Sequence, residues 1–182
     1  VGDVLEKYFK ALGGKDKASQ VEDVKIELNA SIQGQNLKIT LMNKLPNLSY
    51  NEVSMNGNPV MVQYFDGEKG GISQMGSKMP VTDDMAKDMA FQAAVFPELA
   101  FSDYGIDPQL TGVEQIGVKK AYAVEYQLPS GSKSIAYYDV ESGLKIRSVT
   151  FVNTPQGSVE QSMDYENYKE VEGIKFPYTI IQ

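Results

Sequence analysis

The chain has 182 residues, a formal net charge of −7 and a pI of about 4.7. This acidic balance excludes nucleic acid as the main partner and disfavours anionic membrane surfaces, since both require clustered basic side chains. The sequence contains no histidine and no cysteine. Their absence excludes histidine-based catalytic triads, thiol catalysis and zinc sites built from these residues, so we expect neither a metal nor a cofactor.

Length and hydropathy indicate how the chain is organised. A length of 182 residues is sufficient for a complete hydrophobic core, which predicts a single domain over residues 1–182. No apolar run is long enough to cross a membrane as a helix. The first residue is Val1 and not methionine, so we expect this domain to be part of a longer protein.

The chain opens with an amphipathic helical pattern. Apolar side chains recur at helical spacing from Val4 to Leu12, and Gly13-Gly14 follows them directly. Glycine after the last periodic residue is typical of a helix end. The pattern predicts an N-terminal helix that packs on a sheet, with a further short turn over residues 15–20.

From Val24 onward the apolar period changes to two, which is typical of half-buried strands. Asn56-Gly57, Asp66-Gly67 and Glu172-Gly173 are hairpin signals. The sequence thus predicts a mostly β (α+β) fold, a curved antiparallel sheet or open half-barrel of about ten consecutive strands. The expected strands cover residues 24–33, 37–41, 48–55, 60–65, a short run around 72, 113–117, 122–128, 134–138, 144–152, 159–165 and 174–180.

One long helical pattern, Pro80 to Pro97, interrupts the strands. Thr82 can cap its N-terminus, and we expect Pro97 to end it. One apolar stripe of this helix contains Met85, Met89, Ala93 and Phe96, and Phe91 and Val95 fall on another side. A helix that is apolar on two sides has a neighbour on both, or a neighbour on one and a cavity on the other. We interpret it as a lid helix across the sheet.

The lid helix supplies the candidate ligand-binding residues. We expect the first stripe to pack on the sheet, and Phe91 and Val95 to border an apolar cavity. Truncating Phe91 to alanine would then cost roughly 1 kcal/mol or less. The predicted apolar ligand site comprises Met85, Met89, Phe91, Val95 and Phe96.

Methionines are concentrated in one third of the chain. They suit a surface that adapts to variable apolar ligands, although gap-filling in an irregular core is the commoner reason for such a cluster. The methionines concerned are Met55, Met61, Met75, Met79, Met85 and Met89.

Three stretches carry a resemblance to a known family: VLEKYFKALGGKDK (4–17), YYDVESGLKIRSVTF (137–151) and DYENYKEVEGIKFPYTI (164–180). Together they resemble the periplasmic lipoprotein-carrier fold, that of the Lol-carrier and outer-membrane lipoprotein-sorting group. The resemblance implies an incomplete antiparallel barrel with helices over an apolar cavity, which in carriers accepts the acyl chains of lipoproteins. It also implies the periplasm or envelope of a Gram-negative bacterium.

The opening helix with Leu12-Gly13-Gly14-Lys15 looks most like modules at the C-terminal end of insulinase/pitrilysin-type zinc peptidases. The leading hypothesis is therefore a non-catalytic envelope module that binds an apolar ligand or a partner chain, as an accessory domain of such a peptidase. Its partners would be an acyl chain, a lipid, a lipoprotein or an upstream peptidase domain. A free-standing lipoprotein or lipid carrier is the first alternative. The second is a hydrolase that uses carboxylates alone, for which Asp83, Asp84 and Asp88 are candidates.

Overall fold

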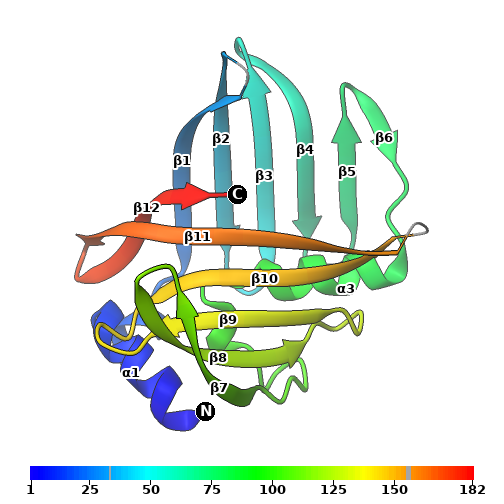
Figure 1. Cartoon of the computed structure of the whole chain (residues 1–182). Helices are drawn as coiled ribbons and strands as arrows, with labels where there is room; N and C mark the ends of the chain where they lie inside the picture. The colour runs from blue at the N-terminus through cyan, green and yellow to red at the C-terminus, as the bar shows by residue number, and fades with distance from the viewer. Residues whose placement is uncertain (33, 155–156) are drawn as a thin grey trace. The chain divides into compact units, whose positions relative to one another are not determined.

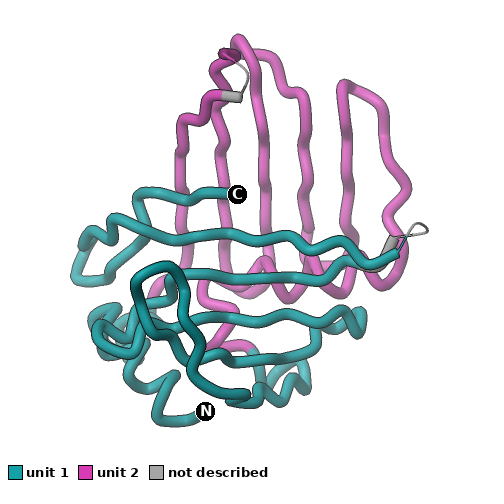
Figure 2. Tube along the Cα trace, in the orientation of Figure 1, with its two compact units in different colours: residues 1–20, 101–182 teal, residues 21–100 magenta. Residues whose placement is uncertain are grey.

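The computed structural model describes residues 1–32, 34–154 and 157–182. These residues form two compact units, one made of residues 1–20 and 101–182 and the other of residues 21–100 (Figure 2). In the described part of the chain each unit contains one six-stranded antiparallel sheet (Figure 1). The single-domain organisation expected from the length stays a prediction.

The 21–100 unit is a sequential meander followed by a helix. Its strands pair in chain order, and Asn56-Gly57 forms the β3–β4 turn with both residues at positive φ (52° and 81°), as a tight hairpin turn requires. The elements are β1 (Asp23–Ile32), β2 (Gln35–Lys44), β3 (Leu48–Met55), β4 (Asn58–Asp66), β5 (Gly70–Gln74), β6 (Ser77–Met79), α3 (Asp83–Gln92) and the 3₁₀ helix η1 (Pro97–Leu99).

Helix α3 begins as predicted but ends earlier. The Thr82 hydroxyl accepts a hydrogen bond from the Met85 amide at 3.3 Å, which caps the first turn. The helix ends at Gln92, so Val95 and Phe96 lie beyond it. Phe96 is extended, with φ −126° and ψ 96°, because a residue that precedes proline is sterically excluded from the helical region. Pro97 therefore restricts the backbone of Phe96, and the predicted helical stripe does not extend to that residue.

The unit of residues 1–20 and 101–182 joins two N-terminal helices to the second sheet. Its strands also pair in chain order, from β7 at one edge to β12 at the other. The elements are α1 (Gly2–Leu12), α2 (Lys15–Ser19), β7 (Gln109–Ile116), β8 (Lys119–Gln127), β9 (Lys133–Asp139), β10 (Lys145–Thr154), β11 (Gly157–Val171) and β12 (Ile174–Ile181).

Helix α1 packs on this second sheet, as its apolar stripe predicts. Tyr8 is buried, and its ring centroid lies 5.0 Å from that of Tyr138 on β9. The Lys7 ammonium donates to the carbonyl of Val140 in the β9–β10 turn. At the other end of the helix, Gly13 lies directly against the backbone of Gly173 in the β11–β12 turn. These contacts hold the middle of α1 and its C-terminal end against the sheet.

The mostly β fold with an N-terminal helix and a mid-chain helix is confirmed. The expected number and arrangement of strands are not: the described residues form twelve strands in two sheets instead of about ten in one meander. Residues 77–79, which are not among the expected strands, form β6. Met75 and Gly76 both take positive φ (50° and 80°) and turn β5 back into it.

Candidate functional site

The 21–100 sheet has one apolar and one polar face, because alternate residues of each strand point to opposite sides. The pairing registers of the strands identify which residues share a side. We call the first side the apolar face. Apart from the buried Phe65, its apolar members are Val24, Ile26, Leu28, Ala30, Leu37, Ile39, Leu41, Val53, Met55, Met61, Ile72 and Met79.

The opposite side is the polar face. On it the Glu27 carboxylate lies 3.1 Å from the Lys25 ammonium and 2.9 Å from that of Lys38. The hydrogen bond from Lys38, followed by that from Lys25, lowers the pKa of Glu27. Charges of this kind belong to a solvated surface. The paired residues of the apolar face include no charged side chain. This face therefore suits an apolar ligand better than the polar face, although the polar face also carries Met42, Leu48 and Tyr64.

Helix α3 covers one end of the apolar face. Gly70 on β5 leaves room for Met89, whose sulfur would lie only 2.7 Å from a Cβ added at that position. On β2, the Asn43 amide donates to the carbonyl of Gln92 at 3.0 Å, which ties the end of α3 to the sheet. Phe65, the cross-strand neighbour of Gly70, is buried in the same region. The covered end thus comprises the row of residues 43, 65 and 70.

The rest of the apolar face is half-buried or exposed. Of its apolar members named above, Phe65 alone belongs to the buried core. Met61 and Met79 are 42% and 46% exposed. Accessible apolar side chains on neighbouring strands are uncommon without a partner and mark surfaces that bind apolar groups. The period-two runs in residues 24–41 and the methionine cluster were the sequence signals of this surface.

The predicted lid residues are distributed differently from expectation. Met89 is 4% exposed and packs on Gly70, as expected for the stripe that faces the sheet. Met85 is 40% exposed, so the expectation that it packs in the same stripe is wrong. The contacts of α3 with the sheet described above begin at Met89, one turn later.

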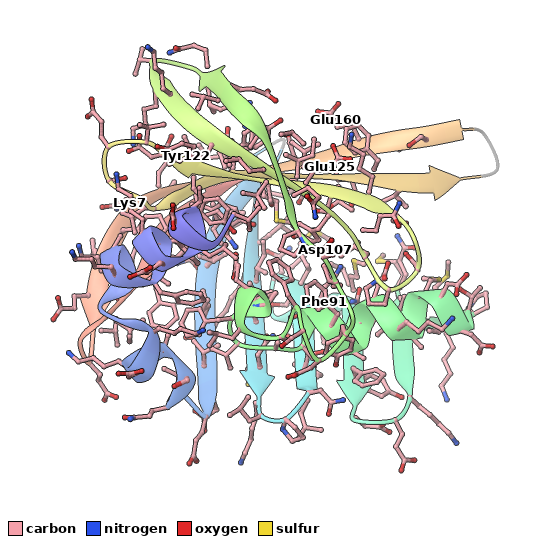
Figure 3. The ribbon with its side chains drawn as sticks, turned by 90° about the horizontal axis from the view of Figure 1, so that it is seen from below. Lys7, Phe91, Asp107, Tyr122, Glu125 and Glu160 are labelled. Atoms are coloured by element: carbon pink, nitrogen blue, oxygen red, sulfur yellow. The ribbon has the colours of Figure 1, made fainter. Side chains whose placement is uncertain are left out.

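The remaining lid residues are enclosed to different degrees. Phe91, labelled in Figure 3, is 2% exposed. Phe96 is buried as well, and Val95 is half-buried. Their binding role stays a prediction.

The difference between Met89 and Met85 gives a direct stability prediction. Met89→Asp should lower the free energy of unfolding by several kcal/mol, because it buries a carboxylate beside Gly70 without a compensating partner. Met85→Asp, on the same helix but exposed, should stay within about 0.5 kcal/mol of the parent. Urea denaturation of both variants checks this. Equal midpoints for the two would mean that α3 does not pack through Met89.

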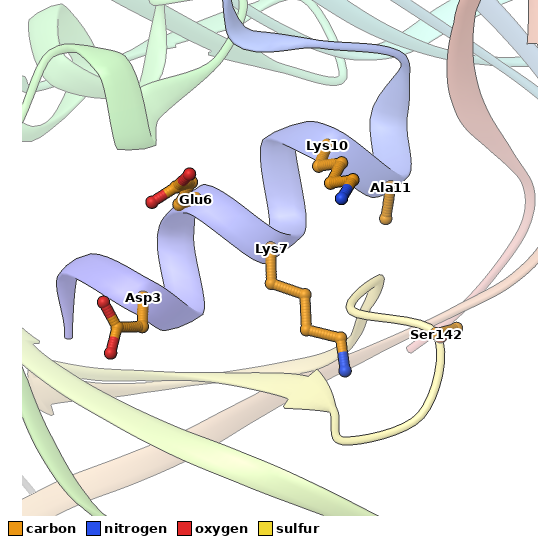
Figure 4. A pocket seen from close by; sticks show the side chains of 6 residues that line it. All are labelled: Asp3, Glu6, Lys7, Lys10, Ala11 and Ser142. Carbon is orange, nitrogen blue, oxygen red and sulfur yellow. The ribbon is translucent and has the colours of Figure 1, made fainter.

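A charged groove lies on the outer side of α1, with a volume of about 540 Å³ (Figure 4). The Lys7 side chain extends from the helix toward the β9–β10 turn, where it donates to Val140. Mixed charges and open access to water do not suit an apolar ligand. The groove is lined by Asp3, Glu6, Lys7, Lys10, Ala11 and Ser142.

Carboxylates with shifted pKa values have structural partners. The side-chain hydrogen bond from Arg147, at 2.8 Å to one carboxylate oxygen, lowers the pKa of Asp164. Burial raises the pKa of Asp139, but hydrogen bonds from Ser142 and the turn backbone, with the charge of Lys119, bring it below the usual value. A general acid needs a raised pKa, so neither group suits that role.

The candidate carboxylates of α3 do not form a metal site. Asp84 pairs with Lys87 at 3.0 Å on the exposed side of the helix. Among the residues that the structure describes, no group of three or more acidic side chains is placed to hold a metal ion. The geometry therefore offers nothing that favours a carboxylate hydrolase over a binding surface.

The sequence matches no protein-family model and no curated protein. The fold, in contrast, is found in solved structures. A LolA-superfamily protein from Nitrosomonas europaea aligns with a TM-score of 0.57 at 13% identity, over 98% of this chain and 83% of its own. A DUF1329-family protein from Desulfovibrio piger aligns with a TM-score of 0.53 at 12% identity, over 100% of this chain and 86% of its own. The chain has the fold of these proteins.

Proposed function

We propose that this chain is a non-catalytic module of the bacterial envelope that binds the acyl chain of a lipid or lipoprotein on its apolar sheet face. The observation that carries the proposal is the set of accessible apolar side chains on β1 to β6, opposite a polar face. Burying such side chains against an acyl chain contributes about 25 cal/mol per Å² of apolar surface removed from water. The LolA-type fold supports the same class of ligand.

The methionines of the sheet agree with this proposal. Met55, Met61 and Met79 lie on the apolar face, and flexible thioether side chains adapt to ligands of variable shape. No helix in the described residues is long and apolar enough to cross a membrane.

The role of the module within a larger protein stays a prediction. Free-standing carriage of lipid or lipoprotein is one form of it. The peptidase-accessory role rests on the similarity of the opening helix alone and has no counterpart among the structural comparisons.

Titration with a fluorescent fatty acid tests the proposal. Ile39→Asp places a charge in the middle of the apolar face and should weaken probe binding roughly tenfold or more, because that carboxylate would have to be desolvated under the ligand. Asn29→Asp, on the polar face opposite Lys38, is the matched control and should bind the probe like the parent. Circular dichroism would verify that both variants fold. Failure of the parent to bind any fatty acid, or equal losses in both variants, would exclude this face as the site.

A further inference from the structure

Strand β1 is an unusually regular sheet edge. It is the terminal strand of its sheet, and it pairs with β2 through ten consecutive residue pairs without a register shift. The other terminal strands have features that discourage pairing: β6 has three residues, β7 has a register shift between Leu110 and Gly112, and β12 contains Pro177. β1 is therefore the edge best suited to accept another strand.

The ladder shows which backbone groups of β1 point outward. The Leu45 amide donates to the carbonyl of Glu22 at 2.8 Å, in continuation of the β1–β2 register. In an antiparallel ladder, residues alternate between those bonded to the neighbouring strand and those directed away from it. The even-numbered residues of β1, like Glu22, thus form backbone hydrogen bonds with β2. The backbone N–H and C=O groups of the odd-numbered residues Asp23, Lys25, Glu27 and Asn29 point outward.

We propose that β1 pairs in antiparallel register with β1 of a second copy of this chain, about a twofold axis at Ile26. In this register Lys25 lies opposite the partner's Glu27, and Glu27 opposite the partner's Lys25. On the other side of the ribbon Val24 lies opposite the partner's Leu28, and the two Ile26 side chains meet on the axis. The outward backbone groups then form hydrogen bonds between the copies.

Charge and the length of the paired segment together select this register. An axis at Val24 would also oppose Lys25 to the partner's Asp23, but it would pair only residues 23–25 of β1, whereas the axis at Ile26 pairs residues 23–29. An axis at Glu27 would oppose two glutamates, and an axis at Lys25 would oppose two lysines, which is unfavourable for directly paired residues. An axis at Leu28 would leave Lys25 opposite the partner's Ser31, without an ion pair. With the axis at Ile26, each Glu27 lies between Lys38 of its own β2, at 2.9 Å in this structure, and the partner's Lys25.

The pairing would join the apolar faces of the two copies, because Val24, Ile26 and Leu28 lie on that face. A single strand pair buries less surface than a typical stable interface, so the dimer should be weak and concentration-dependent. This inference does not depend on acyl-chain binding, since the edge and the apolar face use different groups.

A cysteine placed on the axis would trap the dimer. The chain has no cysteine of its own, so a single substitution gives an unambiguous cross-link. Ile26→Cys would place two Cα atoms about 4.5 Å apart, within the range of a disulfide. Leu28→Cys is the matched control on the same face, since its two copies would lie about 13 Å apart.

Mild oxidation of concentrated protein followed by a non-reducing gel should give roughly tenfold more disulfide dimer for Ile26→Cys than for Leu28→Cys. Equal cross-linking of the two, or none for Ile26→Cys, would overturn the proposed pairing. If β1 pairs with a strand other than β1 of a second copy, Ile26→Cys should give no disulfide dimer.

A charge exchange tests the register independently. Lys25→Glu or Glu27→Lys alone would oppose like charges at both symmetry-related pairs and should weaken self-association in sedimentation velocity several-fold. The double variant Lys25→Glu with Glu27→Lys restores opposite charges across the axis and should recover dimer formation. A double variant as weak as the single ones would overturn the Ile26-centred register. Urea denaturation of each variant separates this effect from a loss of folding.

Discussion

Gly13→Ala should lower the free energy of unfolding by about 3 kcal/mol or more. Gly13 follows α1 with φ +128° and ψ 0°, a conformation that glycine tolerates and alanine does not. A Cβ at this position would also lie 2.1 Å from the carbonyl oxygen of Gly173 in the β11–β12 turn. That oxygen belongs to the backbone, so relief of the contact requires α1 or the turn to move.

Gly14→Ala is the matched control for this effect. Gly14 also has positive φ, +117°, but an added Cβ there would meet no atom within 4 Å. Its substitution should cost only the backbone strain, about 1–3 kcal/mol. Chemical denaturation of both variants measures the difference, which isolates the contact between Gly13 and Gly173. If the two variants were equally stable, the close approach of α1 to the β11–β12 turn would not exist in solution.

Local sequence signals predicted most of the strands. Alternating apolar residues give β1 its half-buried side, and Asn56-Gly57 and Glu172-Gly173 supply positive φ at both turn positions. Strand β6 was not predicted. Methionine rarely adopts positive φ, so the Met75-Gly76 pair gives no compositional signal of the position at which the turn ends and a strand begins.

Two properties of the fold could not be read from local patterns. The pairing of β1 to β6 and of β7 to β12 in separate sheets depends on which edges meet, and strand periodicity contains no information on that. Helix α3 ends at Gln92, and Phe96, which directly precedes Pro97, is held in an extended conformation. A helical period counted through to Phe96 overlooks this constraint.

The sequence predicted that the candidate site is apolar, but it did not predict which residues form it. The apolar character was evident from the methionines and alternating strands, but the ligand contacts were assigned to α3. Met89 packs closely on Gly70, as the helical stripe predicts, whereas Met85 of the same stripe is exposed, and so is Met61 on β4. A glycine in a strand signals close approach only when the opposing element is known.

Phe91 provides the sharpest distinction between a core residue and a ligand contact. Its position away from the main stripe of α3 favoured a cavity-lining role and a cost of roughly 1 kcal/mol or less for truncation to alanine. In the structure it is 2% exposed and among the largest fully buried side chains. Phe91→Ala should instead lower the free energy of unfolding by about 3–5 kcal/mol, the range for a core phenylalanine.

Met85→Ala on the exposed side of α3 is the control and should change the free energy of unfolding by less than about 0.5 kcal/mol. Urea denaturation gives both values, and fatty-acid titration of the folded fraction completes the test. A core residue affects stability and leaves the affinity of the native protein unchanged, whereas a ligand contact changes the affinity.

A loss of roughly 1 kcal/mol or less together with altered probe affinity would show that Phe91 contacts the ligand. A large loss of stability with unchanged affinity would leave the strands as the binding surface.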